Sequence, residues 1–418
     1  MGGDGQVSGG AGIGGAIAGA LRTRRGAAAA LAFPATRAFQ VVLLAAGTFL
    51  IVFQGHAMGP LIPMLSAEFG VPAAVAGLLV PAYSLPYSVT ALVYGPLSDR
   101  LRRGHVILFC LGSLTLALMV TGLAPTLGVL LGIRVAAGAA AGGVVPVSIA
   151  SIGDLYAYHE RGRPIGFVFA ALTAGLAAGL SLGPGLAASV GWRGLYLGLA
   201  ALAAAVRALS ALGPAGRPAV HAEMGRPSAG ATDYRAVLAL GRARRVYALM
   251  LAVGACTYGS IAWFGLYANA GYGVGGAAIG AAYLAYGAVC TLSPFTGALA
   301  DRVGQAALVP AGFAAIALGW LVVALRGPFA LSLAGLAAVA LGHQLTYPPL
   351  AAIASELAPE ARGRAMAFNT FSLFLGISGG SLLIGALQSR GFDLAFGSIA
   401  LIGTLGAIAS LVWLRGER

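Results

Sequence analysis

The sequence predicts an all-α membrane protein whose twelve transmembrane helices form two pseudo-symmetric six-helix bundles. Three observations lead to this prediction. The 418-residue chain is 59% hydrophobic and only 9% charged, whereas soluble domains carry about 25% charged residues. Its apolar residues are gathered into runs of about 20, the length that crosses a bilayer as a helix. The longest polar interval separates six of these runs from the other six.

The order of the runs predicts the domain organisation. We expect a disordered basic tail at 1–37, an N-terminal six-helix bundle at 38–212, a linker at 213–245, a C-terminal six-helix bundle at 246–414 and a short tail at 415–418. The expected spans are residues 38–63, 72–97, 105–124, 126–152, 164–189, 192–212, 246–270, 276–299, 305–325, 328–353, 364–388 and 392–414.

Arginine placement predicts the orientation, because cytoplasmic segments carry an excess of basic residues. With the N-terminus inside, both tails, the linker and most Arg-bearing turns are cytoplasmic, and only Arg193, Arg326 and Arg390 fall outside. Both termini are therefore expected in the cytoplasm. The formal net charge of +13 is explained by this topology, so the expected partner is the lipid bilayer and not nucleic acid.

Charged residues at the span ends repeat between the two halves. Asp99 and Asp301 are 202 positions apart, and so are Asp154 and Glu356. A carboxylate in such a turn can stabilise the N-terminus of a neighbouring helix and pair with an arginine in one relative position of the helices only. We therefore expect a conformational latch; the alternative is a charge cluster that only sets topology. The latch candidates are Asp99, Arg100, Arg103, Asp154, Asp301, Arg302 and Glu356.

Two short motifs carry a family resemblance. The segments 95–100 (GPLSDR) and 297–302 (GALADR) resemble the loop 2–3 and loop 8–9 signature of the major facilitator superfamily, and the resemblance covers about residues 38–414. It implies a network of Asp99, Arg103 and Asp154, whereas Gln305 stands where the second copy usually has a basic residue. It also implies a secondary transporter of a small-molecule substrate in the bacterial cytoplasmic (inner) membrane, which we expect to be a monomer.

Several polar side chains within the spans do not repeat, and these are candidates for substrate binding or proton coupling: Gln54, His56, Arg134, His343 and Gln344. Arg134 lies about 14 Å into its span at 1.5 Å per residue, where a charge is costly without a cavity or a partner. Its segment resembles the superfamily's helix 4 motif, whose Arg is tied to proton coupling. The alternative is a buried Arg bonded to helix carbonyls.

Histidine titrates near physiological pH, so His56 and His343 are candidate proton carriers. The alternative for each is a structural, hydrogen-bonded histidine. No Asp or Glu lies clearly within a span, and Gln54 occupies the position where related drug antiporters often carry an Asp. The commonest carboxylate proton carrier is therefore missing from the sequence.

The fifth span carries a Gly-Pro motif without a counterpart in the second half. Its residues Gly179, Gly183 and Pro184 resemble the helix 5 motif of antiporters. We expect small residues here to let this helix approach the other half closely, and the proline to set a kink. The alternative is ordinary Gly-rich packing.

No enzymatic motif is present. The chain shows no phosphate loop, no metal-ligand cluster and no nucleophile–base pair, so we expect no enzymatic activity, no cofactor and no metal. The favoured function is proton-coupled efflux of a small organic solute by alternating access. The alternatives are an uptake symporter or facilitator on the same fold, and a non-transporting membrane receptor or scaffold.

Overall fold

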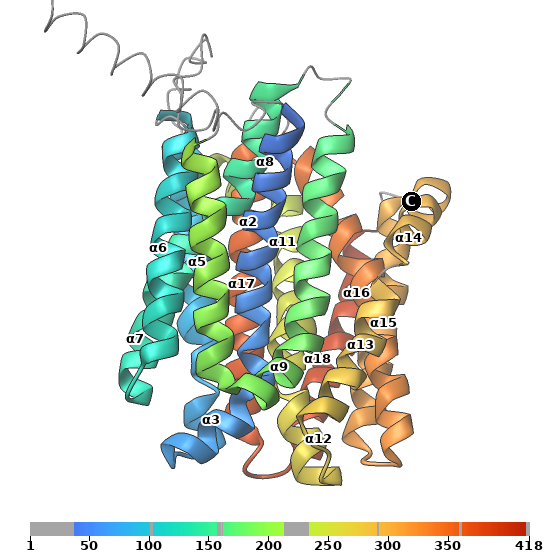
Figure 1. Cartoon of the computed structure of the whole chain (residues 1–418). Helices are drawn as coiled ribbons and strands as arrows, with labels where there is room; N and C mark the ends of the chain where they lie inside the picture. Colours follow the sequence, from blue (N-terminus) through green and yellow to red (C-terminus); the bar gives the residue numbers. More distant parts are fainter. Residues whose placement is uncertain are drawn as a thin grey trace, which may run out of the picture.

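The computed structural model describes residues 37–100, 103–156, 160, 162–212, 234–290, 292–358 and 362–414. The expected tails at 1–36 and 415–418 and most of the linker, 213–233, lie outside the described residues. The described elements are all helices (Figure 1). This confirms the predicted all-α fold class.

The described residues of the first half form nine helical elements. They are α2 (Arg37–Ala57), η1 (Gly59–Leu61), α3 (Ile62–Phe69), α4 (Ala73–Ala76), α5 (Leu79–Arg100), α6 (Arg103–Leu123), α7 (Leu127–Ala141), α8 (Val144–Leu155) and α9 (Gly162–Leu212).

In the second half, the part of the chain that the structure describes forms ten helical elements. They are α10 (Arg235–Ala239), α11 (Gly241–Gly254), the π-helical turn η4 (Ala255–Gly259), α12 (Phe264–Tyr272), α13 (Gly276–Cys290), α14 (Ser293–Val303), α15 (Gln305–Ala324), α16 (Phe329–Glu356), α17 (Arg362–Leu387) and α18 (Phe392–Trp413).

These elements account for the twelve expected spans. Nine helical segments of the described residues are long and apolar enough to cross a membrane, and the bent pair formed by α11–η4 and α12 is a tenth. The α9 helix has 51 residues, which is about 75 Å at 1.5 Å per residue and hence two crossings. The shorter apolar helix α13 continues into α14 and completes the set.

A glycine divides α9 into its two spans. Gly191 has φ 74° and ψ 155°, a backbone conformation open mainly to glycine because it has no Cβ. The chain therefore reverses direction between the fifth and sixth spans with no further loop residues.

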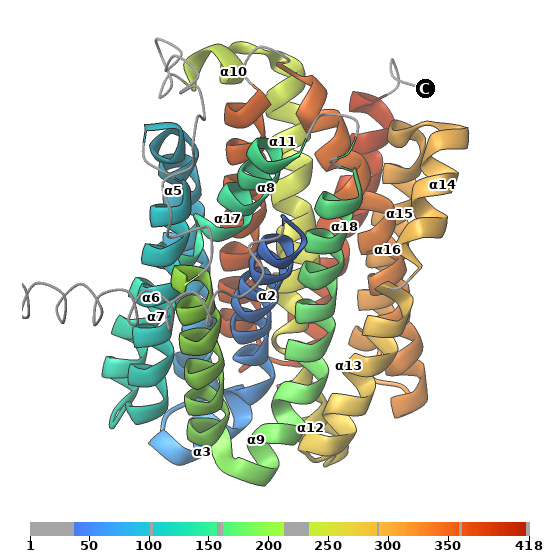
Figure 2. The same ribbon diagram turned by 45° about the horizontal axis from the view of Figure 1, so that its top comes forward.

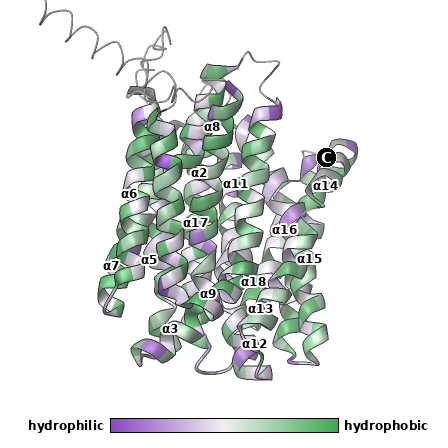
Figure 3. Cartoon of the chain, viewed as in Figure 1, coloured by the Kyte–Doolittle hydropathy of each residue, from purple (hydrophilic) through white to green (hydrophobic). Residues whose placement is uncertain are grey.

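Each half has its own hydrophobic core. One core contains only residues of the first half, apart from the partly buried Phe374 packed against it. The other consists of second-half residues joined by Ile62, Ala76, Leu176 and Leu180 of the first half, and these four mark where the halves meet. Many large apolar side chains are exposed on the outside of the protein, and hydrophobic residues predominate along the helices (Figure 3), as expected for helices that face lipid.

The two halves pack tightly at the end opposite the beginning of α2. Here α12 contacts η1 and α3, and both Figure 1 and Figure 2 place α3 and α12 at this end. A Cβ on Gly59 would lie 2.6 Å from Cβ of Ala262, and one on Gly77 would lie 2.2 Å from the Trp263 ring. Side chains at these glycines would push the halves apart, so we call this contact the distal seal.

Candidate functional site

A cavity lies between the two halves, on the inner side of the distal seal. It contains about 570 Å³ of space free of protein atoms, part of which is open to the surroundings. From the first half it is lined by Ile51, Val52, Gly55, His56, Gly59, Val80, Tyr83, Ser84, Tyr87 and Leu180, and from the second by Tyr258, Ile261, Ala262, Phe374 and Ile377. The wall is apolar and aromatic, with hydroxyl groups and one imidazole as its polar side-chain groups. Such a lining suits a small organic molecule.

Two contacts close the cavity between α5 and α17. The Tyr87 ring stacks on the Phe374 ring with their centroids 3.8 Å apart. The hydroxyl oxygens of Ser84 and Ser378 lie 2.6 Å apart and share a hydrogen bond. Both contacts join opposite halves, so both must break if the halves separate here.

The structure brings both predicted histidines into contact with one tyrosine. Tyr258, within the π-helical turn η4, has its hydroxyl 2.8 Å from Nε2 of His343. The His56 ring packs edge-on against Tyr258 with centroids 5.2 Å apart. The two histidines come from different halves, and the tyrosine between them lines the cavity.

The hydrogen bonds of the histidines differ. Nδ1 of His56 bonds the Val52 carbonyl oxygen at 2.8 Å, which leaves Nε2 as the other proton-exchanging atom of that ring. Nε2 of His343 bonds Tyr258, while its buried Nδ1 has no hydrogen-bond partner among the described residues. Tyr258 can therefore exchange a proton with His343 through a hydrogen bond, whereas its contact with His56 is ring packing.

The predicted pair Arg134 and Gln54 also meets. Nη1 of Arg134 donates to Oε1 of Gln54 at 2.8 Å, and both side chains are buried. The Arg134 guanidinium carbon lies 4.4 Å from the centroid of the Tyr83 ring, a cation–π geometry. Tyr196 donates to the Gln54 backbone oxygen at 3.0 Å and so ties α9 to α2 beside this pair.

Gln344 does not join either group. Its amide nitrogen donates to the Cys290 backbone oxygen at 2.9 Å, across the packing of α16 on α13. The residue after His343 in the sequence is therefore engaged in helix packing, away from the lining of the cavity.

The Gly-Pro motif of α9 contacts a different helix from the one expected. A Cβ on Gly179 would lie 2.5 Å from the Phe53 backbone oxygen, and one on Gly183 would lie 3.0 Å from Cβ of Ala57. Both glycines thus face α2 in their own half. The expectation that they face the other half is wrong. Their small size shapes the N-terminal bundle.

Contact between α9 and the other half uses glycines of α13 instead. A Cβ on Gly280 would lie 2.5 Å from the Ser181 backbone oxygen, and one on Gly276 would lie 3.3 Å from the Pro184 backbone oxygen. Small residues do bring the two halves together along α9, but α13 supplies them.

The latch set is only partly described. The side chains of Asp99, Arg100, Asp154 and Asp301 lie outside the described part of the chain. Arg103 donates to the Ala150 backbone oxygen of α8, which joins the start of the third span to the end of the fourth. Arg302 and Glu356 are exposed. The latch remains a prediction.

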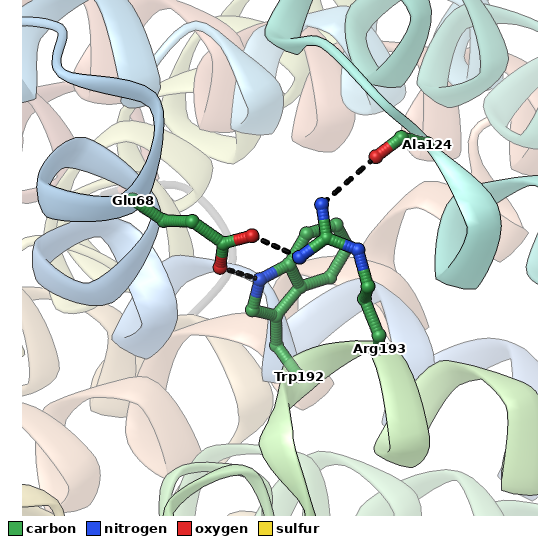
Figure 4. Close-up of polar contacts among 4 residues, drawn as sticks. All are labelled: Glu68, Ala124, Trp192 and Arg193. Carbon is green, nitrogen blue, oxygen red and sulfur yellow. Dashed lines mark hydrogen bonds and ion pairs between the residues drawn. The ribbon is translucent and has the colours of Figure 1, made fainter.

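Sequence reasoning missed a cluster at the distal end (Figure 4). Glu68 at the end of α3 accepts hydrogen bonds from the Trp192 ring nitrogen and from Arg193. Arg193 also donates to the Ala124 backbone oxygen at 3.1 Å. The sequence offers one signal for this cluster, because the predicted topology places both Glu68 and Arg193 outside the membrane on the same side. The two residues are 125 positions apart, so their pairing does not follow from the sequence.

Tyr258 is not among the residues predicted for the site. The sequence does carry one signal for it: it stands 202 positions after His56, the same offset that relates the acidic repeats. Among the described residues, no group of three His, Cys, Asp or Glu converges as a metal site.

Comparison with known proteins agrees with this architecture. A model of the Major Facilitator Superfamily matches residues 44–294 and 271–418. The chain belongs to the Major Facilitator Superfamily and is a multi-pass membrane transporter. Its relatives are transporters and not enzymes.

Individual relatives cover the chain to different extents. The uncharacterized MFS-type transporter YceJ of Bacillus subtilis (strain 168) is 28% identical over 345 residues, 81% of this chain and 86% of that protein. A chloramphenicol resistance protein of Pseudomonas aeruginosa is 32% identical over 157 residues, 36% of each chain. A solved bacterial homolog of the human lysosomal transporter Spinster, in an inward-facing and occupied conformation, matches with a TM-score of 0.72 at 15% identity. It covers 91% of this chain and 97% of its own.

Proposed function

We propose that the protein exports a small, largely apolar organic solute across the bacterial cytoplasmic membrane in exchange for protons. The observation that carries the proposal is the position of His56, Tyr258 and His343. Proton-exchanging groups from both halves meet at the wall of the cavity, where a change in protonation would act on the contact between the halves. A transporter works by alternately opening such a contact to either side.

Two further observations support this function. The cavity lining is apolar and aromatic and includes no acidic or basic side chain other than His56, which favours solutes without a net positive charge. The motif Gly179, Gly183 and Pro184 resembles that of antiporters, and a relative over part of the chain is named for chloramphenicol resistance. Chloramphenicol is therefore a reasonable first probe.

The orientation is part of the proposal. The beginning of α2 and the end of α18 lie at the end opposite the distal seal (Figure 1), and the excess of basic residues in the sequence of the tails and the linker favours the cytoplasm for this end. In this orientation the seal is on the outer side, between the cavity and the exterior of the cell. Reporter fusions at Gly225 and after Arg418 should both report a cytoplasmic position, and an external signal from either would contradict this orientation.

Inside-out membrane vesicles test the coupling. Acidifying the vesicle interior should drive accumulation of radiolabelled chloramphenicol, and a protonophore should abolish it. His56→Gln and His343→Gln should each weaken the response to the gradient, while Ser189→Ala, on an exposed hydroxyl, should leave it unchanged. Accumulation that persists after the gradient is collapsed would replace exchange by facilitated diffusion. Accumulation only in right-side-out vesicles would indicate uptake.

A further inference from the structure

The Arg134 side chain is buried with part of its hydrogen-bonding capacity unused. It is 1% exposed, and Nη1 donates to Gln54. Its Nε and Nη2 atoms have no hydrogen-bond partner among the described residues. A guanidinium carries five N–H donors and no acceptor, so the unused atoms can be satisfied only by acceptors.

No acidic side chain of the described residues balances this charge. Arginine stays protonated at physiological pH, and its side-chain partner Gln54 is neutral. The acidic side chains that the structure describes are Glu68, Glu160, Glu356 and Asp393, and all of them lie at or near helix ends. A buried charge without a counter-ion is unfavourable, and a hydrogen-bonded anion removes most of that penalty.

The guanidinium is separated from the cavity by a single ring. Tyr83 lines the cavity and also covers Arg134 at 4.4 Å. The Tyr83 ring is confined, because a Cβ on Gly55 would lie 3.3 Å from it. A molecule in the cavity is therefore one side chain away from the free donors of Arg134.

We propose that Arg134 binds a monovalent anionic group that enters from the cavity past Tyr83. The group is a halide or a carboxylate, and its single charge matches the single guanidinium. It supplies, at Nε and Nη2, the negative charge that a carboxylate at position 54 would supply at Nη1. The site does not depend on the proposed direction of transport or on proton exchange.

Thermal unfolding of the purified full-length protein in detergent tests the site, because a ligand that binds only the folded state raises the midpoint. Midpoints are compared in sodium chloride, bromide, acetate and benzoate, against a bulky sulfonate salt at equal ionic strength. Wild type should show a saturable rise with at least one of the four anions. Stabilisation by chloride and bromide alone identifies an inorganic ion, and stabilisation by acetate or benzoate alone identifies a carboxylate.

The decisive variant is Gln54→Glu, which supplies a carboxylate 2.8 Å from Nη1 in place of the amide oxygen. It should abolish the anion-dependent rise, whereas the neutral control Gln54→Asn should keep it. Arg134→Gln should also abolish the rise. If Arg134→Gln fails to fold, the comparison of Gln54→Glu with Gln54→Asn still tests the site.

Equal unfolding midpoints for wild type in all five salts, or an undiminished rise in Gln54→Glu, would overturn the proposal. Because the readout is binding, its outcome is separate from that of the vesicle transport experiment.

Discussion

The Tyr87 ring of α5 lies almost parallel to the Phe374 ring of α17, with the planes 9° apart. This stack joins the two halves beside the cavity, and the hydroxyl pair of Ser84 and Ser378 lies on the same two helices. Alternating access requires the halves to separate at one end as they close at the other. A covalent link across the α5–α17 contact should therefore block the motion between the halves, and its effect on transport can be measured.

A cross-link here should stop transport. With Ser84→Cys and Ser378→Cys combined, the sulfur atoms would replace oxygens only 2.6 Å apart, close enough for a disulfide of about 2.05 Å. Oxidation should abolish transport in vesicles, and a reductant should restore it. Each single cysteine variant should be insensitive to oxidation. Transport by the oxidised double variant, with the cross-link verified by mass spectrometry, would show that the halves do not separate at this contact.

Removing the Tyr258 hydroxyl should affect transport more than stability. Tyr258→Phe keeps the ring that packs on His56 but leaves Nε2 of His343 without its partner, at a cost of about 1–3 kcal/mol. The protein should still fold, and the dependence of transport on the proton gradient should fall sharply. Tyr272→Phe, which removes a hydroxyl bonded to Gly327, is the matched control. Unchanged gradient dependence in Tyr258→Phe would remove the tyrosine from the proton path.

Glycines of α9 should respond very differently to one added methyl group. In Gly179→Ala the new Cβ would lie 2.5 Å from the Phe53 backbone oxygen, so we expect a loss of stability of about 1–3 kcal/mol from overpacking. In Gly185→Ala nothing lies within 4 Å of the new atom, and the helix should gain up to about 1 kcal/mol. Thermal unfolding in detergent measures both. A larger loss in Gly185→Ala than in Gly179→Ala would contradict the packing of α9 on α2.

The predicted latch can be tested at Asp99 and Asp301, whose side chains lie outside the described part of the chain. Asp99→Asn keeps the shape of the side chain and removes its charge, so membrane insertion should be normal and transport should be lost. Asp301→Asn should have a milder effect, because Gln305 replaces the basic residue that is usual in that copy. Transport assays normalised to membrane expression test both. Full transport by Asp99→Asn would leave only the topological role of the charges.

The cluster around Glu68 should be sensitive to how the carboxylate is replaced. Glu68→Gln keeps an acceptor for the Trp192 ring nitrogen and loses a part-exposed ion pair with Arg193, worth at most about 1 kcal/mol. Glu68→Ala also leaves the N–H of the buried Trp192 ring without a hydrogen-bond acceptor, which lowers the free energy of unfolding by about 1–3 kcal/mol. Unfolding midpoints should therefore fall further for Ala than for Gln. Equal losses would assign the whole effect to the charge.

The fold was accessible from the sequence because the bilayer imposes a strict length and polarity on each span. The order of the spans and the division of α9 near Gly191 could be predicted for this reason. The side-chain pairings were harder, because they depend on how helices are rotated about their axes. Arg134 and Gln54 were separately identified as polar residues in apolar spans, yet 80 positions separate the two partners. Gly179 faces α2 because of how α9 is rotated about its axis, and the spacing of residues along one helix does not determine that rotation.

The contact between His56 and Tyr258 has one more consequence. These residues occupy equivalent places in the repeated halves, 202 positions apart, and their rings touch. Two equivalent residues that touch must lie beside the rotation axis that relates the halves. At this axis an imidazole from one half meets a phenol from the other, so the centre of the molecule is chemically unequal on its two sides.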